Sequence, residues 1–490
     1  MKKFYLLTLI SFLSCGIISA ADYVTVGDGT TYTFQSLSEI MDSGVTKDGS
    51  TYEVANNITI SVNDNFQIEN GITVKMGNAV QLRIDGSANF EATERVLFTR
   101  SSNIALPKGV YIMDDINVTK FKNIDFEYCG LRAFGDKGLT VDNCTFRYNN
   151  GKLSGSGALS FGQDNTCYTI TNCTFESNEV PGVGGPANLR CGCIIENCTF
   201  IDNNTKNSNK PQINISVGGD NEVIIRDCTL TGAQRTKVGG IAISNTNALE
   251  GANIVTIENN DIRGHRYGIT TNYGHQQVTI KGNKIIDNCY AASAAAGGSG
   301  ISIYDNVGVQ TVVITNNHFE KNWWGITIIG GKEVNVGKTE DPSAADYNPG
   351  GNVFKDNGNN GKLYDIYNNT ALTVYAQGNK WGVDEQTEEK IETVIFHKND
   401  DTSKGEVIFM PAMEEGSVSD IVTDDENIQF INGEIQVQSA ETVIIYTLSG
   451  QMVQEFNDVK GSVDISSLQK GLYIAYVKTA TGVHVVKCLL

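Results

Sequence analysis

Aromatic residues at a repeated spacing are the clearest candidates for chemistry in this 490-residue chain. Tyr267, Tyr290 and Trp324 each lie five residues after a large apolar residue, and Trp323 precedes the last of them. Flat ring faces stack on pyranose rings, so aromatics at one position of successive repeats favour a surface that binds a sugar chain. Rings at such positions can also cover the edge of a repeat without binding a ligand, and this alternative stays open.

Polar side chains beside these aromatics could bind sugar hydroxyls. Arg266 is a donor, while His265 and Asn322 can both donate and accept hydrogen bonds. The expected partner is a polysaccharide or a cell-surface glycan. The expected ligand-binding residues are Tyr267, Tyr290, Trp323, Trp324, His265 and Arg266.

Residues for catalysis do not emerge from the pattern. Hydrolysis or elimination on a sugar needs a positioned acid and base, yet the five histidines are dispersed through the chain. Residues from different repeats can still converge in the fold, so the catalytic residues stay unknown. Cys191, Cys193 and Cys198 lack the spacing of two Cys-x-x-Cys pairs, so we expect no metal site and no cofactor.

Four of the 11 cysteines occupy one position of a repeated unit: Cys144, Cys173, Cys198 and Cys228. Later copies of the unit carry asparagine there. Equivalent residues of stacked parallel strands lie about 4.8 Å apart, and such neighbours seldom orient their Cβ atoms for a disulfide. We therefore interpret the four as a column of buried free thiols, with disulfides as the alternative for an exported chain.

The elements that position all these residues are repeats of about 29 residues, because nine copies of a four-residue unit span the 235 residues from Phe146 to Trp381. This period is typical of solenoids. The copies are Asn143–Phe146, Asn172–Phe175, Asn197–Phe200, Asp227–Leu230, Asn259–Ile262, Gly282–Ile285, Asn316–Phe319, Gly351–Phe354 and Gly378–Trp381.

Alternating apolar residues such as Val255 and Ile257 precede each unit, which is the period of a strand with one buried face. A polar column follows three residues after the unit, and a glycine then opens another strand. The polar column is Asn149, Asn178, Asn203, His265, Asn288, Asn322 and Asn357. Short strands joined by Asn and Gly turns predict the coils of a parallel β-helix.

These repeats resemble the parallel β-helix repeat family over most of the chain. The resemblance implies an all-β fold, a right-handed parallel β-helix that begins at about Gln67, followed by a small C-terminal β-sandwich-like domain. We expect an N-terminal cap and first coils over residues 22–106. The β-helix proper should span residues 107–413, with a capping helix within Asp384–Ile395 and a last strand within Gly405–Pro411.

The same family includes polysaccharide lyases and polygalacturonases, so the fold alone does not settle the function. Its lyases use clustered aspartates with an Arg or Lys base, and its polygalacturonases pair aspartates with Gly-His-Gly and Arg-x-Lys motifs. Asp114 and Asp115 are followed by neither set, and Gly264–Arg266 matches only in part. We therefore expect a noncatalytic, glycan-binding or adhesin-like protein. A polysaccharide lyase or glycoside hydrolase acting on an acidic, plant or host polysaccharide is the alternative.

Both ends of the chain carry export patterns. Residues 1–21 predict a secretory signal peptide, with Lys2 and Lys3 before an apolar core and small residues up to Ala21. Cys15 leaves open a lipoprotein signal. Residues 414–426 are acidic and predict a linker.

The last domain, residues 427–490, has strand patterns separated by glycine turns. Ile445–Val453, Ile465–Tyr473 and Val486–Leu490 resemble the type A C-terminal sorting domain of the type IX secretion system. The resemblance implies that the type IX machinery is a partner and that the protein is secreted or attached to the outer-membrane surface. A plain adhesive β-sandwich is the alternative.

A net charge of -19 repels phosphate backbones, so we expect no nucleic-acid partner. After the signal, no segment reaches membrane-spanning length, which predicts a protein that is not integral to the membrane.

Overall fold

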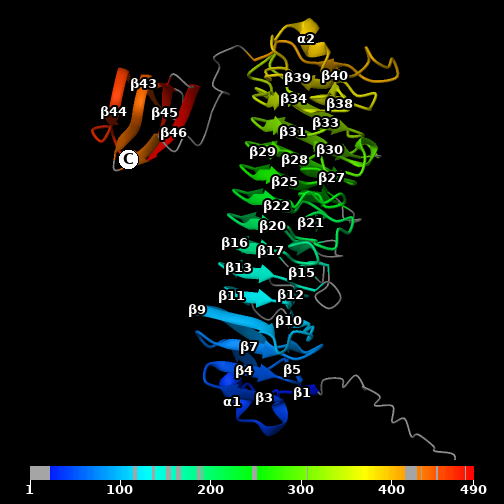
Figure 1. Cartoon of the computed structure of the whole chain (residues 1–490), viewed down its shortest axis with the longest axis vertical. Helices are drawn as coiled ribbons and strands as arrows, with labels where there is room; N and C mark the ends of the chain where they lie inside the picture. The colour runs from blue at the N-terminus through cyan, green and yellow to red at the C-terminus, as the bar shows by residue number, and fades with distance from the viewer. Residues whose placement is uncertain are drawn as a thin grey trace, which may run out of the picture.

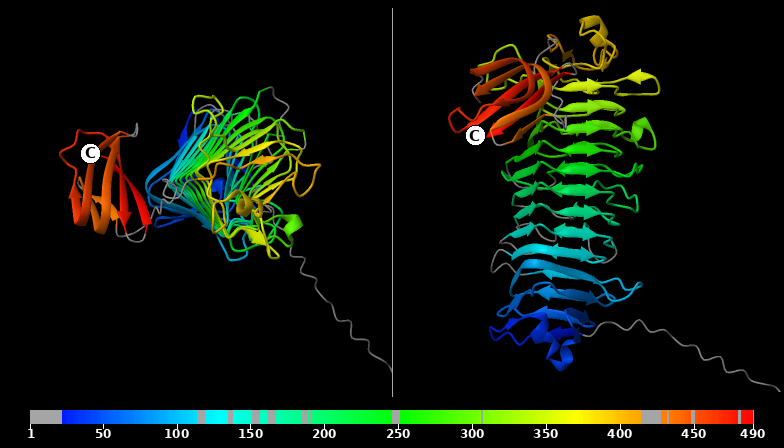
Figure 2. Two further views of the ribbon diagram at one scale, coloured as in Figure 1. Left: turned by 90° about the horizontal axis from the view of Figure 1, so that it is seen from above. Right: turned by 60° about the vertical axis from the view of Figure 1, so that its left-hand side comes forward.

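The computed structural model describes residues 22–113, 119–134, 138–150, 156–161, 167–184, 189, 191–245, 251–305, 307–413, 428–431, 433–447, 451–479 and 482–489. The expected signal peptide and the expected acidic linker lie outside the described residues. Within them, short strands stack coil upon coil along one axis and form three walls of parallel strands, to which all but the last coils contribute (Figures 1 and 2). The predicted all-β fold is confirmed, and its coils begin earlier than Gln67, since β1 already pairs in parallel with β5.

The first wall, which we call sheet A, is one 14-stranded parallel sheet. In spatial order its strands are β1 (Asp22–Val24), β5 (Asn57–Ile60), β8 (Gln81–Ile84), β10 (Gly109–Ile112), β12 (Gly130–Ala133), β15 (Leu159–Phe161), β18 (Val183–Gly184), β21 (Ile213–Ser216), β24 (Ile241–Ser244), β27 (Ile269–Asn272), β30 (Ser299–Tyr304), β33 (Trp324–Ile328), β38 (Ile366–Asn368) and β40 (Ile395–Phe396).

The second wall precedes the repeated turn of each coil. It consists of β2 (Thr31–Tyr32), β6 (Asn65–Gln67), β9 (Ser87–Arg100), β11 (Thr119–Glu127), β13 (Leu139–Asp142), β16 (Tyr168–Thr171), β19 (Cys193–Glu196), β22 (Glu222–Arg226), β25 (Asn253–Glu258), β28 (Gln276–Lys281), β31 (Thr311–Thr315), β34 (Glu333–Gly337), β39 (Val374–Ala376) and β41 (Val407–Ile408).

The third wall follows that turn, and the long strands β9 and β11 run through both walls. Its other strands are β4 (Thr51–Val54), β7 (Thr73–Met76), β14 (Thr145–Arg147), β17 (Thr174–Glu176), β20 (Thr199–Ile201), β23 (Thr229–Thr231), β26 (Asp261–Arg263), β29 (Lys284–Ile286), β32 (His318–Glu320) and β35 (Val353–Lys355). Two short antiparallel additions lie at its margins: β3 (Val45–Asp48) beside β4, and the hairpin of β36 (Gly358–Asn359) and β37 (Lys362–Leu363).

The repeated four-residue unit is a strand, a left-handed turn and a strand. The asparagine or aspartate that opens most of the units has a positive φ, for example 51° at Asn143 and 55° at Asn172, a conformation in which asparagine is several-fold enriched. The fourth residue points inward and stacks on its equivalent in the next coil. Ring centroids of Phe146 and Phe175 are 4.9 Å apart and those of Phe175 and Phe200 are 4.7 Å apart, which matches the spacing of paired strands.

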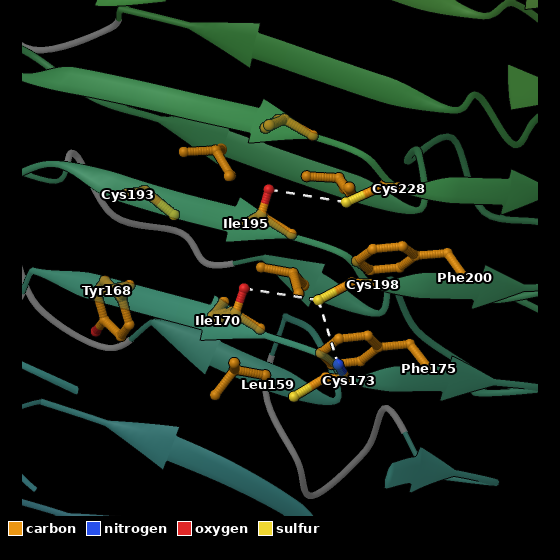
Figure 3. Packing of buried hydrophobic residues seen from close by; sticks show 14 of the residues in the cluster. Leu159, Tyr168, Ile170, Cys173, Phe175, Cys193, Ile195, Cys198, Phe200 and Cys228 are labelled. Carbon is orange, nitrogen blue, oxygen red and sulfur yellow. Dashed lines mark hydrogen bonds between the residues drawn. The ribbon is translucent and has the colours of Figure 1, made fainter. Parts of the chain in front are cut away.

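The predicted cysteine column is confirmed: all four thiols are free and buried, and Figure 3 shows three of them, Cys173, Cys198 and Cys228. Each backbone N–H of Cys144 and Cys173 donates to the sulfur one coil further on, at 3.4 Å, and Cys228 N donates to Asn260 Oδ1 at 3.0 Å. Thiols therefore occupy the acceptor sites that asparagine amides occupy in later coils. Burial raises the pKa of the Cys173 thiol well above its usual range, because a thiolate there would lose its hydration.

One disulfide joins neighbouring coils outside this column, between Cys167 and Cys191, whose Cα atoms are 4.8 Å apart. Sequence reasoning did not find this pair. The sulfur of Cys191 is bonded to that of Cys167 and is therefore not available as a metal ligand.

Alkylation of the denatured, unreduced protein tests this distribution. We expect peptides containing Cys144, Cys173, Cys198 and Cys228 to be modified, because their sulfurs are free. The Cys167 and Cys191 peptides should appear cross-linked and serve as the internal control for complete non-reducing handling. Mass spectra that showed column cysteines joined in pairs would contradict the structure.

Both ends of the solenoid carry short helices. Helix α1 (Phe34–Ser38) starts at Thr33, whose side chain accepts a hydrogen bond from Ser36 N in a capping box. Helix α2 (Glu388–Glu392) is shorter than the expected segment and has Thr387 as N-cap without a side-chain hydrogen bond. Two 3-10 turns, η1 (Met41–Ser43) and η2 (Ala294–Ala296), complete the helical elements of the described residues.

The C-terminal domain is an antiparallel sheet of β42 (Ile428–Ile431), β43 (Glu434–Thr447), β44 (Met452–Asp464), β45 (Leu472–Thr479) and β46 (Gly482–Leu489). The alternating patterns that begin at Glu434 and at Thr442 are the two halves of the single strand β43, which has a register shift between Val437 and Ala440. The sheet encloses its own apolar core, which includes Ile435, Val443 and Cys488. Among the described residues, no helix combines the length and apolar character needed to span a membrane.

Candidate functional site

The outward face of sheet A changes character toward the C-terminal end. Along its central column, β27, β30 and β33 present Thr270, Ser302 and Thr327, which are small. The next two coils present Tyr367 and Phe396 at the same position. Small residues therefore lead to a pair of rings, whose centroids are 4.3 Å apart and whose planes differ by 11°.

Trp324 and Tyr364 extend this pair into what we call the C-terminal aromatic cluster: Trp324, Tyr364, Tyr367 and Phe396. The centroid of Trp324 is 6.4 Å from that of Tyr364 and 6.1 Å from that of Tyr367. All four side chains are half-buried, so each keeps part of its ring in contact with solvent. The cluster draws on three successive coils of sheet A, and its rings form the kind of apolar platform on which sugar rings stack.

Trp324 presents carbon to the solvent. Its indole Nε1 is buried and has no hydrogen-bond partner among the residues that the structure describes. Because the side chain is nevertheless half-exposed, its accessible part is ring carbon, which suits stacking better than hydrogen bonding. Trp323 lies beside it with its ring against Gly298, where an added Cβ would come within 2.6 Å of the ring.

The expected column of Tyr267, Tyr290 and Trp324 is corrected by the strand register. Ser299 pairs with Trp324, and counting back from the pair Ile269 and Ile301 aligns Tyr267 with Ser299. Tyr290 is separated from β30 by the segment 291–298, whereas Tyr267 and Trp324 each lie two residues before the sheet A residue they precede, Ile269 and Ile326. Its hydroxyl donates to Asp287 Oδ2 at 2.8 Å, and burial raises its pKa to about 12.

Arg266 holds loops together. Its guanidinium donates to the carbonyl of Ala296, from Nε at 2.9 Å, and to Asn209 Oδ1. It also lies 5.7 Å from the ring of Tyr267. The donors that sequence reasoning assigned to sugar hydroxyls thus already have partners within the protein.

His265 lies inside the solenoid, with only 1% of its surface exposed. The polar column to which it belongs is buried, and we call it the amide spine. Each side-chain amide donates to the oxygen of the next coil, as Asn149 does to Asn178 at 2.8 Å and Asn288 does to Asn322 at 3.3 Å. A histidine in this position cannot reach a surface ligand while the coil keeps its fold, which corrects its expected role.

A missing amide explains why the spine contains histidine. Strand register aligns Asn203 with Ala233 and then with His265; Ala233 is exposed, so the middle coil contributes no side chain to the buried column. The longer Gln212 accepts from Asn203 Nδ2 at 2.8 Å and reaches His265 Nε2 at 2.6 Å. Two long side chains thereby bridge the coil in which alanine interrupts the spine.

Hydrogen bonding fixes the histidine as a neutral tautomer. Gln212 donates to Nε2, so the proton must lie on Nδ1, which donates to Asn288 Oδ1 at 3.1 Å. Protonating Nε2 would set two donors against each other in a buried site. Burial lowers the pKa of His265 from 6.5 to about 4.

Replacing His265 with asparagine should change how stability depends on pH. Between pH 6.5 and about 4, His265 binds a proton in the unfolded state but not in the folded state. The free energy of unfolding therefore falls as the pH is lowered. We expect this acid-dependent loss, on the order of 3 kcal/mol, to be absent in His265→Asn. Urea unfolding of both proteins at pH 7.5 and pH 4.5 measures it.

Asp365 also makes the stability of both proteins depend on pH, so its contribution has to be separated from that of His265. Its Oδ1 accepts from Asn357 at 3.2 Å, its Oδ2 accepts from Gly382 N at 2.7 Å, and burial raises its pKa to about 7. The sign is opposite, because the folded state binds the proton more tightly and stability falls as the pH rises toward 7. Both proteins contain Asp365, so its contribution cancels. Equal acid sensitivity in the two proteins would contradict the neutral tautomer.

Asp365 is also the one described carboxyl group whose pKa is raised in this way, and it lies inside the solenoid at 1% exposure. It therefore cannot serve as a surface acid for a bound sugar. Among the residues that the structure describes, no group of three or more His, Cys, Asp or Glu side chains is arranged to hold a metal ion.

Sequence reasoning missed Tyr364, Tyr367 and Phe396. Counting forward from Phe354 reaches Asn359, because the β36–β37 hairpin lengthens this coil before sheet A. Counting back from the strand would have found Tyr364, which precedes Ile366 by two residues as Trp324 precedes Ile326.

Comparison with known families agrees with the architecture. Residues 129–340 match the family described as right handed beta helix region, and residues 422–490 match the secretion system C-terminal sorting domain. The crystal structure of the periplasmic alginate epimerase AlgG is similar with a TM-score of 0.33 and 12% identity, over 78% of this chain and 83% of that one. No curated protein sequence matches the chain.

The chain is thus a right-handed parallel β-helix protein. It carries a type IX secretion C-terminal sorting domain, as the sequence motifs predicted, and it is secreted or attached to the outer-membrane surface.

Removal of residues 420–490 should stop export at the outer membrane, because the sorting domain would be lost while the β-helix keeps its separate core. We expect the truncated protein to accumulate in the periplasm of the host cell, measured by fractionation and immunoblotting. A matched variant with a short tag inserted after Met413 controls for disturbance of the junction. Unchanged surface or medium levels of the truncated protein would refute this role.

Proposed function

We propose that this secreted β-helix protein binds a polysaccharide or cell-surface glycan without transforming it, and that the C-terminal aromatic cluster is the binding platform. The observation that carries the proposal is the group of half-buried rings on the outward face of sheet A, with the Tyr367 and Phe396 planes parallel at 4.3 Å. Half-buried rings fixed by strand pairing offer a stacking surface at low entropic cost, because few rotamers are lost on binding.

Small residues next to the cluster support the same use. Thr327 lies one coil before Tyr367 in the central column, and Ser302 lies one coil further away. Their short side chains leave the sheet face level beside the rings. The buried Thr327 hydroxyl is hydrogen-bonded to Ser299 Oγ at 2.8 Å, whereas the Ser302 hydroxyl is a hydrogen-bonding group on that face. A sugar chain that stacks on the rings can therefore continue along the solenoid.

An enzyme of the lyase or hydrolase class is the competing function. Asp400 and Asp401 are described carboxyl groups near the cluster. Their charges contribute to the raised pKa of Tyr367, but burial is its main cause, and neither carboxylate forms a hydrogen bond to the Tyr367 side chain among the described contacts. Incubation of the protein with pectin, alginate and glycosaminoglycans, followed by assays for reducing ends and unsaturated products, separates the two functions. Product formation at catalytic turnover would replace binding by catalysis.

Substitution of the rings tests the binding platform. We expect Trp324→Ala and Tyr367→Ala each to weaken glycan binding several-fold, since a lost aromatic stack is worth about 0.5–1.5 kcal/mol beyond area burial. Calorimetric titration with the glycans that the parent protein binds on an array measures the change. Both side chains are half-buried, so the free energy of unfolding should fall by less than the roughly 3–5 kcal/mol typical of a core aromatic.

Tyr347→Ala is the matched control, because Tyr347 is 40% exposed and lies outside the cluster. It should bind glycan as the parent protein does. Equal affinity of the Trp324, Tyr367 and Tyr347 variants, or no glycan bound by the parent protein, would overturn the proposal.

A further inference from the structure

Two arginines near the N-terminal end of the solenoid have no anionic partner among the residues that the structure describes. The other described arginines bind carboxylates or carbonyl and amide oxygens, as Arg83 does with Asp85 and Arg235 does with Asp202. Arg100 and Arg132 have no such partner among the described residues, and Arg132 Nε is buried without any hydrogen bond. In a chain of net charge -19, which is rich in carboxylates, unpaired guanidinium groups need an explanation.

Arg100 begins a stack with two tyrosines along the edge between the third wall and sheet A. Strand register aligns Arg100, Tyr128 and Tyr148 on successive coils. The guanidinium carbon is 3.7 Å from the centroid of the Tyr128 ring, and the rings of Tyr128 and Tyr148 are 5.4 Å apart at 27°. Tyr148 is 42% exposed, so the stack ends in an open ring.

The fold does not require tyrosine at this position. Tyr128 and Tyr148 have φ angles of 60° and 59°, a left-handed conformation that is unfavourable for a bulky side chain. Later coils place residues better suited to it in the same column. Asp202, Gly264 and Asp287 are of this kind, while Ser177 and Lys321 also have a positive φ in the column. Two tyrosines kept in a strained conformation at the surface indicate a role other than folding.

Arg132 forms a similar arrangement on sheet A. Its guanidinium carbon is 4.6 Å from the Phe134 centroid and 6.0 Å from the Tyr111 centroid, and those two rings are 6.3 Å apart at 21°. Arg132 follows Tyr128 by four residues, so their Cα atoms can be no more than about 14 Å apart. The two arrangements therefore lie within reach of one short oligosaccharide.

We propose that Arg100, Tyr128, Tyr148, Arg132 and Phe134 form a second binding site, which takes a polysaccharide bearing carboxylate or sulfate groups. Pyranose rings stack on the open ring of Tyr148, and the acidic groups pair with the two guanidiniums. Stacking of Arg100 on Tyr128 and of Arg132 on Phe134 restricts the orientation of each guanidinium, and the weak hydration of a guanidinium favours pairing with a carboxylate or sulfate.

This site is independent of the C-terminal aromatic cluster. Seven strand steps of sheet A separate β12 from β33, a distance of roughly 34 Å at strand spacing. An anionic polymer long enough to reach both sites would bind more tightly than a short oligomer, because the second contact becomes intramolecular.

Binding measurements on the full secreted protein test the second site. The probes are polygalacturonate, a sulfated glycosaminoglycan and dextran, each titrated at low and at physiological salt. We expect the two anionic polymers to bind and dextran to bind more weakly at this site. Arg100→Gln and Arg132→Gln should each reduce affinity for the anionic polymers several-fold and flatten its salt dependence, with no effect on dextran.

Tyr148→Asn isolates the stacking role, because asparagine adopts the left-handed turn more readily than tyrosine. Affinity for the anionic polymers should fall several-fold while the melting temperature stays level or rises. Tyr273→Asn is the matched control: Tyr273 is 43% exposed, also has a positive φ of 49°, and lies outside the site. It should bind as the parent protein does.

The second site is wrong if Tyr148→Asn binds like Tyr273→Asn, or if the arginine variants bind anionic polymers as the parent does. Trp324→Ala, measured with the same probes, separates this result from failure of the proposed function. Loss of binding in the arginine variants alone supports the second site and refutes the aromatic cluster, and loss in Trp324→Ala alone does the reverse.

Discussion

In-register pairing of parallel strands is the constraint on which the rest of this structure depends. Strands about 4.8 Å apart place each side chain directly over its equivalent in the neighbouring coil. Phenylalanine rings therefore stack at 4.7 to 4.9 Å in the core, thiols lie over thiols, and amides donate to amides. The same rule acts on the surface, where it aligns Arg100 with Tyr128 and Tyr367 with Phe396.

Stacking of like residues makes a buried polar column possible. It also makes the hydrogen bonds of each coil depend on the side chain of the next coil. A single coil without an amide, at Ala233, would leave a donor and an acceptor unsatisfied in the interior, which is costly. Gln212 and His265 bridge this gap. His265 is neutral because its Nε2 accepts from Gln212 while its Nδ1 donates to Asn288. His265, which the sequence suggested as a ligand-binding residue, instead completes hydrogen bonds in the core.

The repeat made most of the fold predictable. A unit such as Asn143–Phe146 specifies a turn conformation and an inward ring, and these follow from local chemistry alone. What the sequence could not supply was the register across coils of unequal length. Segment 291–298 and the β36–β37 hairpin lengthen two coils before sheet A. Counting from the repeated unit therefore placed Tyr290 in a column that it does not occupy and missed Tyr364. The inward orientation of His265 could have been predicted from the sequence, since it aligns with asparagines that form the buried spine. The disulfide between Cys167 and Cys191 could not, because it depends on which loops of adjacent coils meet.

The amide spine gives the interior of the solenoid a polarity. Every side chain in it presents its acceptor to the preceding coil and its donor to the following one, from Asn149, whose Oδ1 has no partner within the described part of the chain, to the carboxyl group of Asp365. A duplicated coil bearing asparagine could be inserted between any two neighbouring asparagine coils of the spine without breaking its hydrogen bonds, because the new amide would face the same way as its neighbours. The Asn149 end stays open to such growth, whereas Asp365 accepts from both sides and terminates it. The length of the molecule is thus adjustable in whole coils, and the direction in which coils can be added is set by the order of donors and acceptors in its core.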